Sequence, residues 1–150
     1  MGKKKIATQS AEKAIKEQAA IDTAVAKTSP GRKAKRVELV RVYIRASYNN
    51  TLITVTDEKG GVLAWSSAGS IGFAGPKKAT PFAASKMVSV IAEKLKNYGV
   101  VEMEVYMSGI GGGRDSAVRS LINHGFNIIS IKDVTPVPHN GPRPPKVRRV

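Results

Sequence analysis

The sequence predicts an α/β domain with a mixed five-stranded sheet, carrying a basic N-terminal extension and a proline-rich C-terminal arm. Apolar and polar residues alternate between residues 39 and 67, which indicates half-buried strands. Helix, strand, helix and strand patterns then follow up to residue 132. A chain of 150 residues accommodates one domain of about 100 residues with two tails. We therefore expect an extension over 1–36, a domain over 37–133 and an arm over 134–150.

The extension over 1–36 is rich in Lys, Ala and Gln. A helix between residues 10 and 27 is compatible with its alanines, but the apolar stripe of Ile15, Ile21 and Val25 is too thin to hold it on a core. We expect the segment to be disordered or marginally helical when free and to become ordered, at least in part, on a partner. A solvated tail is the alternative.

The first part of the domain reads as an antiparallel meander of three strands. In the strand over 39–46, the core face is predicted to carry Val40, Val42, Ile44 and Ala46. The opposite face carries Arg41, Tyr43 and Arg45, and the two arginines are either solvated or in contact with phosphate. A turn over 48–50, whose asparagines tolerate positive φ, leads to a strand over 51–56, and a turn over 57–61 leads to one over 62–67.

The next segment combines a flexible loop with a helix start. Phe73 in this loop is interpreted as a plug of the core edge, with stacking on a base as the alternative. Thr80 followed by Pro81 is typical of a helix N-terminus, and the helix is predicted to run to about Tyr98. Because Lys77 and Lys78 stand beside the positive end of this helix dipole, the segment is a candidate phosphate site.

A glycine-rich turn joins the fourth strand to the second helix. The strand over 100–107 is predicted to bury Val101, Met103, Val105 and Met107, and the helix face comprises Ala117, Val118, Leu121 and Ile122. Glycines at 109 and 111–113 leave backbone N–H groups and the helix dipole free to face an anion. Gly125 and Phe126 predict a Schellman closure, followed by the last strand over 128–132. Two crossovers of this kind require parallel strand pairs.

The arm over 134–150 holds five of the eight prolines and is predicted to be neither helix nor interior strand. Fixed φ angles favour a stiff, extended segment that loses little entropy on docking and spaces its cations along a groove. A solvated tail is the less favoured interpretation.

Charge is concentrated in the tails. The net charge is +14, and the extension holds ten Lys or Arg against three acids, while the arm holds four against none. The domain between them is nearly balanced, with eleven against eight. Cationic tails of this kind indicate a polyanionic partner. Nucleic acid is the first candidate, and an anionic membrane surface is the second. The chain has no Cys, which excludes disulfides and thiolate metal sites, and neither an export signal nor a membrane span is expected.

Enzymatic motifs are incomplete. A dinucleotide-binding pattern starting at Gly109 would need its third glycine where Arg114 stands, and a P-loop needs Gly-Lys where Gly113 and Arg114 stand. Neither His124 nor His139 belongs to a recognisable Ser/His/Asp triad. The first strand has no acidic residue of the kind that a two-metal nuclease requires. We therefore expect no enzyme activity, no cofactor, no metal site and no small-molecule substrate.

Several motifs resemble the family of small-subunit ribosomal protein eleven over residues 39–150. The most specific are Asp133-Val-Thr-Pro-Val-Pro-His-Asn-Gly141, Arg143-Pro-Pro-Lys146 and Arg148-Arg-Val150. Further matches are Ser47-Tyr-Asn-Asn-Thr51, Gly72-Phe73, Thr80-Pro-Phe-Ala-Ala84 and Gly111-Gly-Gly-Arg-Asp-Ser-Ala-Val-Arg119. The glycine turn departs from the commoner Gly-Pro-Gly form of the family.

The resemblance implies a ribonuclease H-like fold without catalytic acids and a structural role on the platform of the small ribosomal subunit. There the family bridges helices of small-subunit ribosomal RNA near the messenger RNA exit and the Shine-Dalgarno cleft, beside ribosomal proteins seven and eighteen. A cytoplasmic ribosome is expected, with an organellar one as the alternative. Carried over to matching positions, the RNA-binding residues are Asn49, Asn50, Lys77, Lys78, Arg114, Arg119, His139, Asn140, Arg143, Lys146, Arg148 and Arg149.

Overall fold

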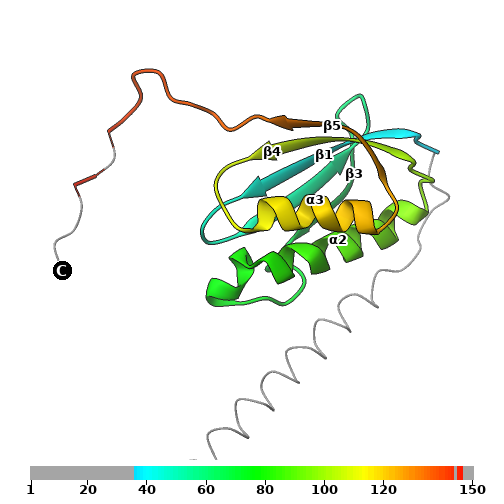
Figure 1. Cartoon of the computed structure of the whole chain (residues 1–150), viewed down its shortest axis with the longest axis horizontal. Helices are drawn as coiled ribbons and strands as arrows, with labels where there is room; N and C mark the ends of the chain where they lie inside the picture. Colours follow the sequence, from blue (N-terminus) through cyan, green and yellow to red (C-terminus); the bar gives the residue numbers. More distant parts are fainter. Residues whose placement is uncertain (1–35, 144, 147–150) are drawn as a thin grey trace, which may run out of the picture.

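The computed structural model describes residues 36–143, 145 and 146. Its five strands are β1 (Leu39–Ala46), β2 (Thr51–Thr56), β3 (Val62–Ser67), β4 (Glu102–Ser108) and β5 (Asn127–Asp133). The helical elements are the short 3-10 helix η1 (Gly75–Ala79) and the α-helices α2 (Pro81–Lys96) and α3 (Gly113–Asn123). Figure 1 shows them in a layered domain from which the arm leaves beyond β5. The helix predicted between residues 10 and 27 lies outside the described residues.

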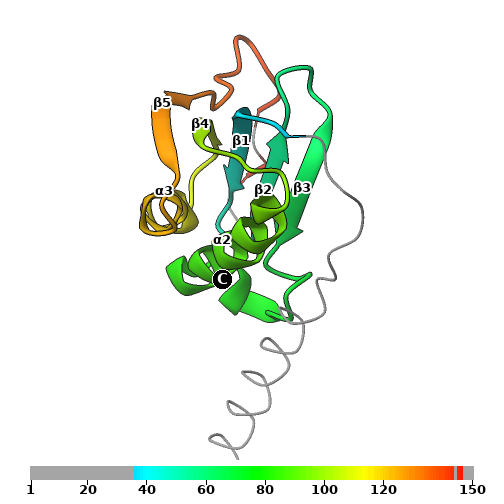
Figure 2. The same ribbon diagram turned by 90° about the vertical axis from the view of Figure 1, so that its right-hand side faces the viewer.

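The sheet has the order β3-β2-β1-β4-β5. β1 pairs antiparallel with β2, and β2 antiparallel with β3, whereas β4 pairs parallel with both β1 and β5. The predicted meander, the mixed sheet and the parallel pairs are thereby confirmed. The chain crosses from the β3 edge to the far side of β1 through α2, so that both α-helices cover the same face of the sheet (Figure 2). The other face carries no helix within the described residues.

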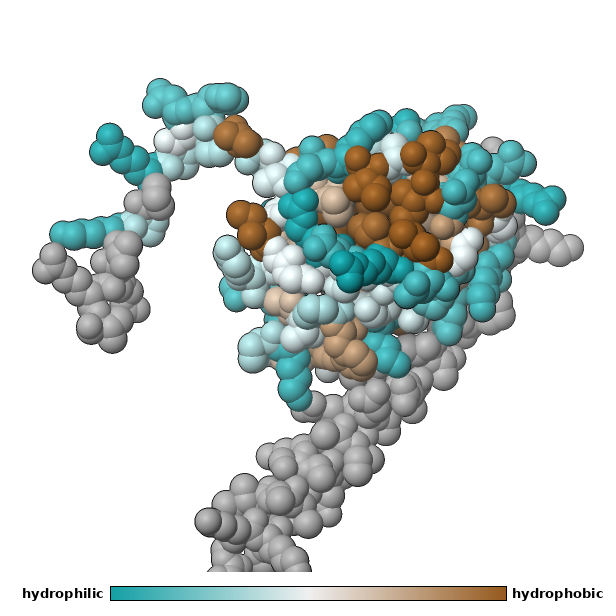
Figure 3. Space-filling view, viewed as in Figure 1, coloured by the Kyte–Doolittle hydropathy of each residue, from teal (hydrophilic) through white to brown (hydrophobic). Residues whose placement is uncertain are grey.

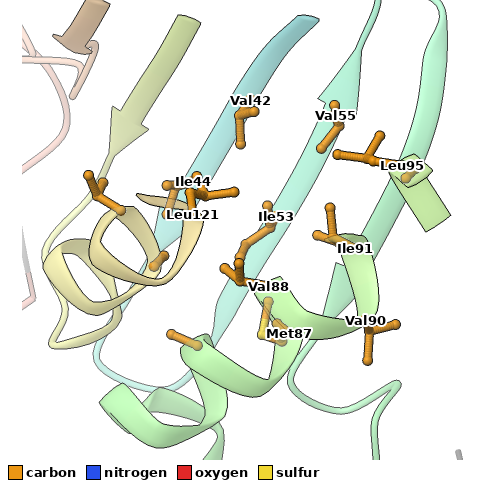
Figure 4. Close-up of a cluster of buried hydrophobic side chains, with 14 of the residues drawn as sticks. Val42, Ile44, Ile53, Val55, Met87, Val88, Val90, Ile91, Leu95 and Leu121 are labelled. Atoms are coloured by element: carbon orange, nitrogen blue, oxygen red, sulfur yellow. The ribbon is translucent and has the colours of Figure 1, made fainter. Parts of the chain in front are cut away.

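The core lies between this sheet face and the helices. Val42 and Ile44 of β1 point toward α2 and α3, together with Ile53 and Val55 of β2 (Figure 4). Burial alternates strictly along β1, as the period-two pattern predicts. The helices complete the cluster with their fully buried side chains Met87, Val88, Ile91, Leu95 and Leu121. Phe73, only 9% exposed, closes the edge of this core against Phe82, which confirms its interpretation as a plug.

The helix ends follow the predicted signals. The Thr80 side chain accepts a hydrogen bond from the Ala83 N–H and caps α2. At the end of α3, the Phe126 N–H donates to the Leu121 carbonyl at 3.4 Å and the Gly125 N–H to the Ile122 carbonyl at 2.9 Å. This pair of bonds is the predicted Schellman closure, with Gly125 at a φ of 85°.

The structure corrects several local predictions. Val101 is 60% exposed because β4 begins only at Glu102, and Ile122 is 56% exposed because it points away from the face through which α3 packs on the core. Apolar side chains gather near the β5 edge in Figure 3, where Ile122, Ile129 and Ile131 are about half exposed. α2 ends at Lys96 rather than near Tyr98. No asparagine in the turn over 48–50 has a positive φ.

Candidate nucleic-acid interface

The topology brings several predicted site segments to one end of the domain. Because β1, β4 and β5 run parallel, their carboxyl ends lie at the same end of the sheet. The β1–β2 turn over 47–50, the glycine loop over 109–113 and the start of the arm all lie at this end, on the left of Figure 1. We call it the carboxyl end of the domain.

The glycines of the loop are required first by its packing on the domain. A Cβ at Gly109 would lie 2.2 Å from the Ala46 carbonyl oxygen, and one at Gly113 would lie 2.5 Å from Thr51 Oγ1. At Gly111 the distance to the Ser47 carbonyl oxygen would be 2.7 Å. These approaches leave no room for a side chain. The predicted phosphate cradle therefore rests directly on the end of β1 and the start of β2.

Two helix N-termini meet at this end. Gly112 is the N-cap of α3, and a Cβ there would lie 3.7 Å from Pro81 Cγ, in the first turn of α2. No side chain caps α3. Because the N-terminus of a helix carries a partial positive charge, the two helices reinforce each other toward an anion. Lys77 and Lys78 belong to η1, immediately before α2, and add two full charges; Lys77 is exposed and Lys78 half-buried.

The root of the arm is fastened to the glycine loop. Arg114 Nη2 donates to Asp133 Oδ2 at 2.6 Å, and Arg114 Nη1 donates to the Gly109 carbonyl. Asp133 Oδ1 also accepts from the Thr135 N–H at 2.9 Å, and Thr135 Oγ1 accepts from the Gly109 N–H at 3.1 Å. The Arg114 guanidinium and then the Thr135 donors hold the pKa of the Asp133 carboxyl well below its usual range. Residues 133–135 and the loop thus form one joint.

The arm beyond Thr135 has no helix or strand in its described part, which agrees with the prediction for a proline-rich segment. His139, Arg143 and Lys146 are exposed. Asn140 is also exposed and adopts a φ of 55° at a bend, a conformation that Asn tolerates better than most residues. Arg148 and Arg149 lie outside the described residues.

The structure thus gathers part of the predicted RNA-binding set. The carboxyl end brings together Asn49, Asn50, Lys77, Lys78 and Arg114, although the guanidinium of Arg114 is held within the joint. Asn50 Oδ1 is buried without a hydrogen-bond partner among the described residues. Arg119 lies exposed farther along α3 and is not part of this cluster. Direct contacts of all these residues with RNA stay predictions.

The RNA-binding residues predicted from the sequence do not include Asp133 and Thr135, which join the arm to the glycine loop. Their spacing is a signal, since an Asp side chain readily accepts a hydrogen bond from the backbone two residues later. Arg41 has an ion pair that neither of its predicted alternatives includes. It pairs with Glu104 at 3.4 Å and donates to the Glu58 carbonyl at 3.2 Å. The Arg45 side chain, by contrast, has no hydrogen bond or ion pair to any residue that the structure describes.

The opposite end of the sheet has another electrostatic character. A pocket there is lined by both signs of charge, with the acids Glu38, Asp57, Glu58 and Glu102 and the cations Arg36 and Lys59. Across residues 36–143, 145 and 146, no group of three or more His, Asp or Glu side chains is placed to hold a metal ion. None of the described helices is long and apolar enough to cross a bilayer. Within the described residues, the features predicted to bind an anion therefore gather at the carboxyl end of the domain.

Comparison with known proteins identifies the family of the chain. The family model described as Ribosomal protein S11 matches residues 40–149. The small ribosomal subunit protein uS11 of Dichelobacter nodosus is 52% identical over 120 residues, covering 79% of this chain and 91% of that protein. The uS11 of Solibacter usitatus is 50% identical over 125 residues, covering 83% and 93%. The chain belongs to the ribosomal protein S11 family.

Proposed function

We propose that this protein is a structural constituent of the small ribosomal subunit and binds small-subunit ribosomal RNA through its carboxyl end and arm. The observation that carries the proposal is that two helix N-termini, two lysines and the root of a cationic arm meet at the carboxyl end of the domain. The lysines are Lys77 and Lys78. RNA of this kind is held mainly through its shape and backbone, which suits backbone N–H groups and spaced cations.

The finer assignment follows the family. The protein sits on the platform and bridges RNA helices near the messenger RNA exit and the Shine-Dalgarno cleft, beside ribosomal proteins seven and eighteen. It acts there without catalysis, in a cytoplasmic ribosome. The balanced domain supports this assignment, because a rigid body with a charged end and a long arm is suited to holding two RNA segments at a fixed distance.

Binding to a small-subunit ribosomal RNA fragment at increasing salt tests the proposal. Replacing Lys77 and Lys78 with Ala should lower the slope of log K against log salt by about 1.5, since each phosphate contact releases roughly 0.7 to 0.9 ion. The matched control replaces Lys94 and Lys96, at the far end of α2, which removes the same charge. Equal slopes for the two variants, or equal affinity for duplex DNA, would contradict binding through this end.

A further inference from the structure

The face of the sheet that no described helix covers carries a row of large side chains. Backbone pairing aligns Trp65, Thr54, Tyr43, Tyr106 and Lys132 across β3, β2, β1, β4 and β5. Neighbours in such a row point to the same side of the sheet. The adjacent residues Val42, Ile53 and Val105 are buried on the opposite side, so the row lies on the uncovered face. We call it the aromatic row.

The rings at one end of the row are already paired. Tyr43 and Tyr106 stack with their centroids 5.1 Å apart and an interplanar angle of 19°. Lys132 Nζ lies 5.3 Å from the Tyr106 ring, on the side of the neighbouring strand, and the Tyr106 hydroxyl donates to Glu104 at 3.0 Å. Both faces of Tyr106 are therefore occupied. Tyr43 has only one face covered, and its other face is directed along the row toward Thr54.

A space for one flat ring follows from this arrangement. Tyr43 and Trp65 are separated by the single strand that carries Thr54, so their backbones lie about 9.6 Å apart at about 4.8 Å per strand. A planar base in contact with a ring on each side needs about 7 Å between those rings. Thr54, the residue between them in the row, has a small side chain and is half-buried. Trp65 is 56% exposed and Tyr43 39% exposed, so both rings are accessible.

The charges beside the row favour an RNA strand as its occupant. Arg45 lies on the same face of β1, two residues beyond Tyr43 toward the carboxyl end of the domain. Its side chain is exposed and has no partner among the described residues. In the row on the other side, Arg41 is neutralised by Glu104. The uncompensated cation therefore lies on the side of the glycine loop and the arm. A strand held at the carboxyl end thus meets the Arg45 guanidinium before it reaches the aromatic row.

Ordinary cross-strand packing accounts for only part of the row. Stacked aromatic pairs on neighbouring strands stabilise sheets, which explains Tyr43 and Tyr106. Trp65 has no ring partner among the described residues, and its largest neighbour in the row on the adjacent strand is Thr54. We propose that Tyr43 and Trp65 form a stacking site for an unpaired base of single-stranded RNA. The inference rests on the proposed function, since it adds a site to the same RNA interface.

Trp65 is the only tryptophan of the chain, which makes the test direct. Titrating the full-length protein with a single-stranded uridine decamer should quench tryptophan emission saturably, whereas a blunt RNA duplex of equal length should leave it nearly unchanged. Unchanged emission at concentrations where a labelled decamer is shown by anisotropy to be bound would overturn the stacking site.

Variants define the contribution of each ring. Trp65→Ala should weaken decamer binding roughly 5- to 150-fold, because stacking of one base on an aromatic side chain is worth about 1 to 3 kcal/mol. Trp65→Phe should restore most of the affinity. Val101→Ala, which removes a 60% exposed apolar side chain just before β4, at the opposite end of the sheet from the proposed RNA interface, should have no effect. If Trp65→Ala binds the decamer as Val101→Ala does, the inference is wrong.

The same variants separate this inference from the proposed function. If Trp65→Ala binds the decamer normally while the wild-type protein still binds ribosomal RNA and enters subunits, only the stacking site fails. If the wild-type protein does not bind ribosomal RNA, the proposed function itself fails. Trp65 emission that changes only when purified small-subunit proteins are added would assign the row to a protein partner and would also overturn the inference.

Discussion

The glycine loop and the proline arm start at the same joint but obey different constraints. The loop lies against β1 so closely that Gly109 has no room for a Cβ, whereas the described arm beyond Thr135 is exposed. The sequence of the loop is thus dictated by the fold of the domain. The sequence of the arm contributes little to that fold, and its prolines and cations are those expected of a segment that docks on RNA. The charges of the two segments do not by themselves distinguish these two roles. Measurements of the free energy of unfolding do.

The largest effect is expected in the loop. Gly109→Ala places a Cβ 2.2 Å from the Ala46 carbonyl oxygen at a φ of 87°, so the domain should lose about 4 kcal/mol or more of its free energy of unfolding. Urea denaturation followed by circular dichroism measures this loss. A stability within about 1 kcal/mol of the wild type would show that the loop is free to move away from β1.

Removing the arm should leave the stability of the domain nearly unchanged and alter its binding to RNA. A chain that ends at Thr135 keeps the joint but loses the four cations of the arm. Its melting temperature should stay within about 2 °C of the full chain, while the salt slope for ribosomal RNA binding should fall by about 3. Scanning calorimetry and filter binding at several salt concentrations measure the two quantities. A large fall in melting temperature would mean that the arm belongs to the fold.

A second glycine sharpens the argument about the loop. Gly125 has a φ of 85°, close to that of Gly109, but a Cβ there would meet nothing within 4 Å. Gly125→Ala should therefore cost only about 1 kcal/mol, the price of the left-handed conformation. Comparing the free energies of unfolding of Gly125→Ala and Gly109→Ala by urea denaturation isolates the effect of crowding. Equal losses for the two variants would remove crowding as the explanation.

The smallest effect concerns the joint. In the wild type, the lowered pKa of Asp133 means that its bonds to Arg114 and Thr135 persist as the pH falls through the usual carboxyl range and are lost only in stronger acid. Arg114→Ala should raise the pKa of Asp133 toward 3.8, so that its remaining bonds to Thr135 break at a higher pH. Carboxyl chemical shifts followed by NMR measure this change. Arg119→Ala, on the exposed side of α3, should leave the Asp133 titration unaltered.

The local patterns of the sequence determined most of the elements. The alternation around Val42 and Ile44, the Thr80 cap and the Gly125 closure all depend on residues a few positions apart, and each was confirmed. Val101 and Ile122 were misassigned because an apolar residue at the end of an element fits the periodic pattern whether or not another element covers it. Period alone does not define where packing stops.

The tertiary structure decided what these elements do to one another. The sequence alone suggested a phosphate cradle from the glycines, but only the placement of β1 beside β4 showed that Gly109 and Gly113 are crowded by Ala46 and Thr51. The bond between Arg114 and Asp133, and the alignment of Tyr43 with Trp65 across β2, likewise depend on strand order and register. Such contacts join residues far apart in the chain, and local periodicity does not encode them.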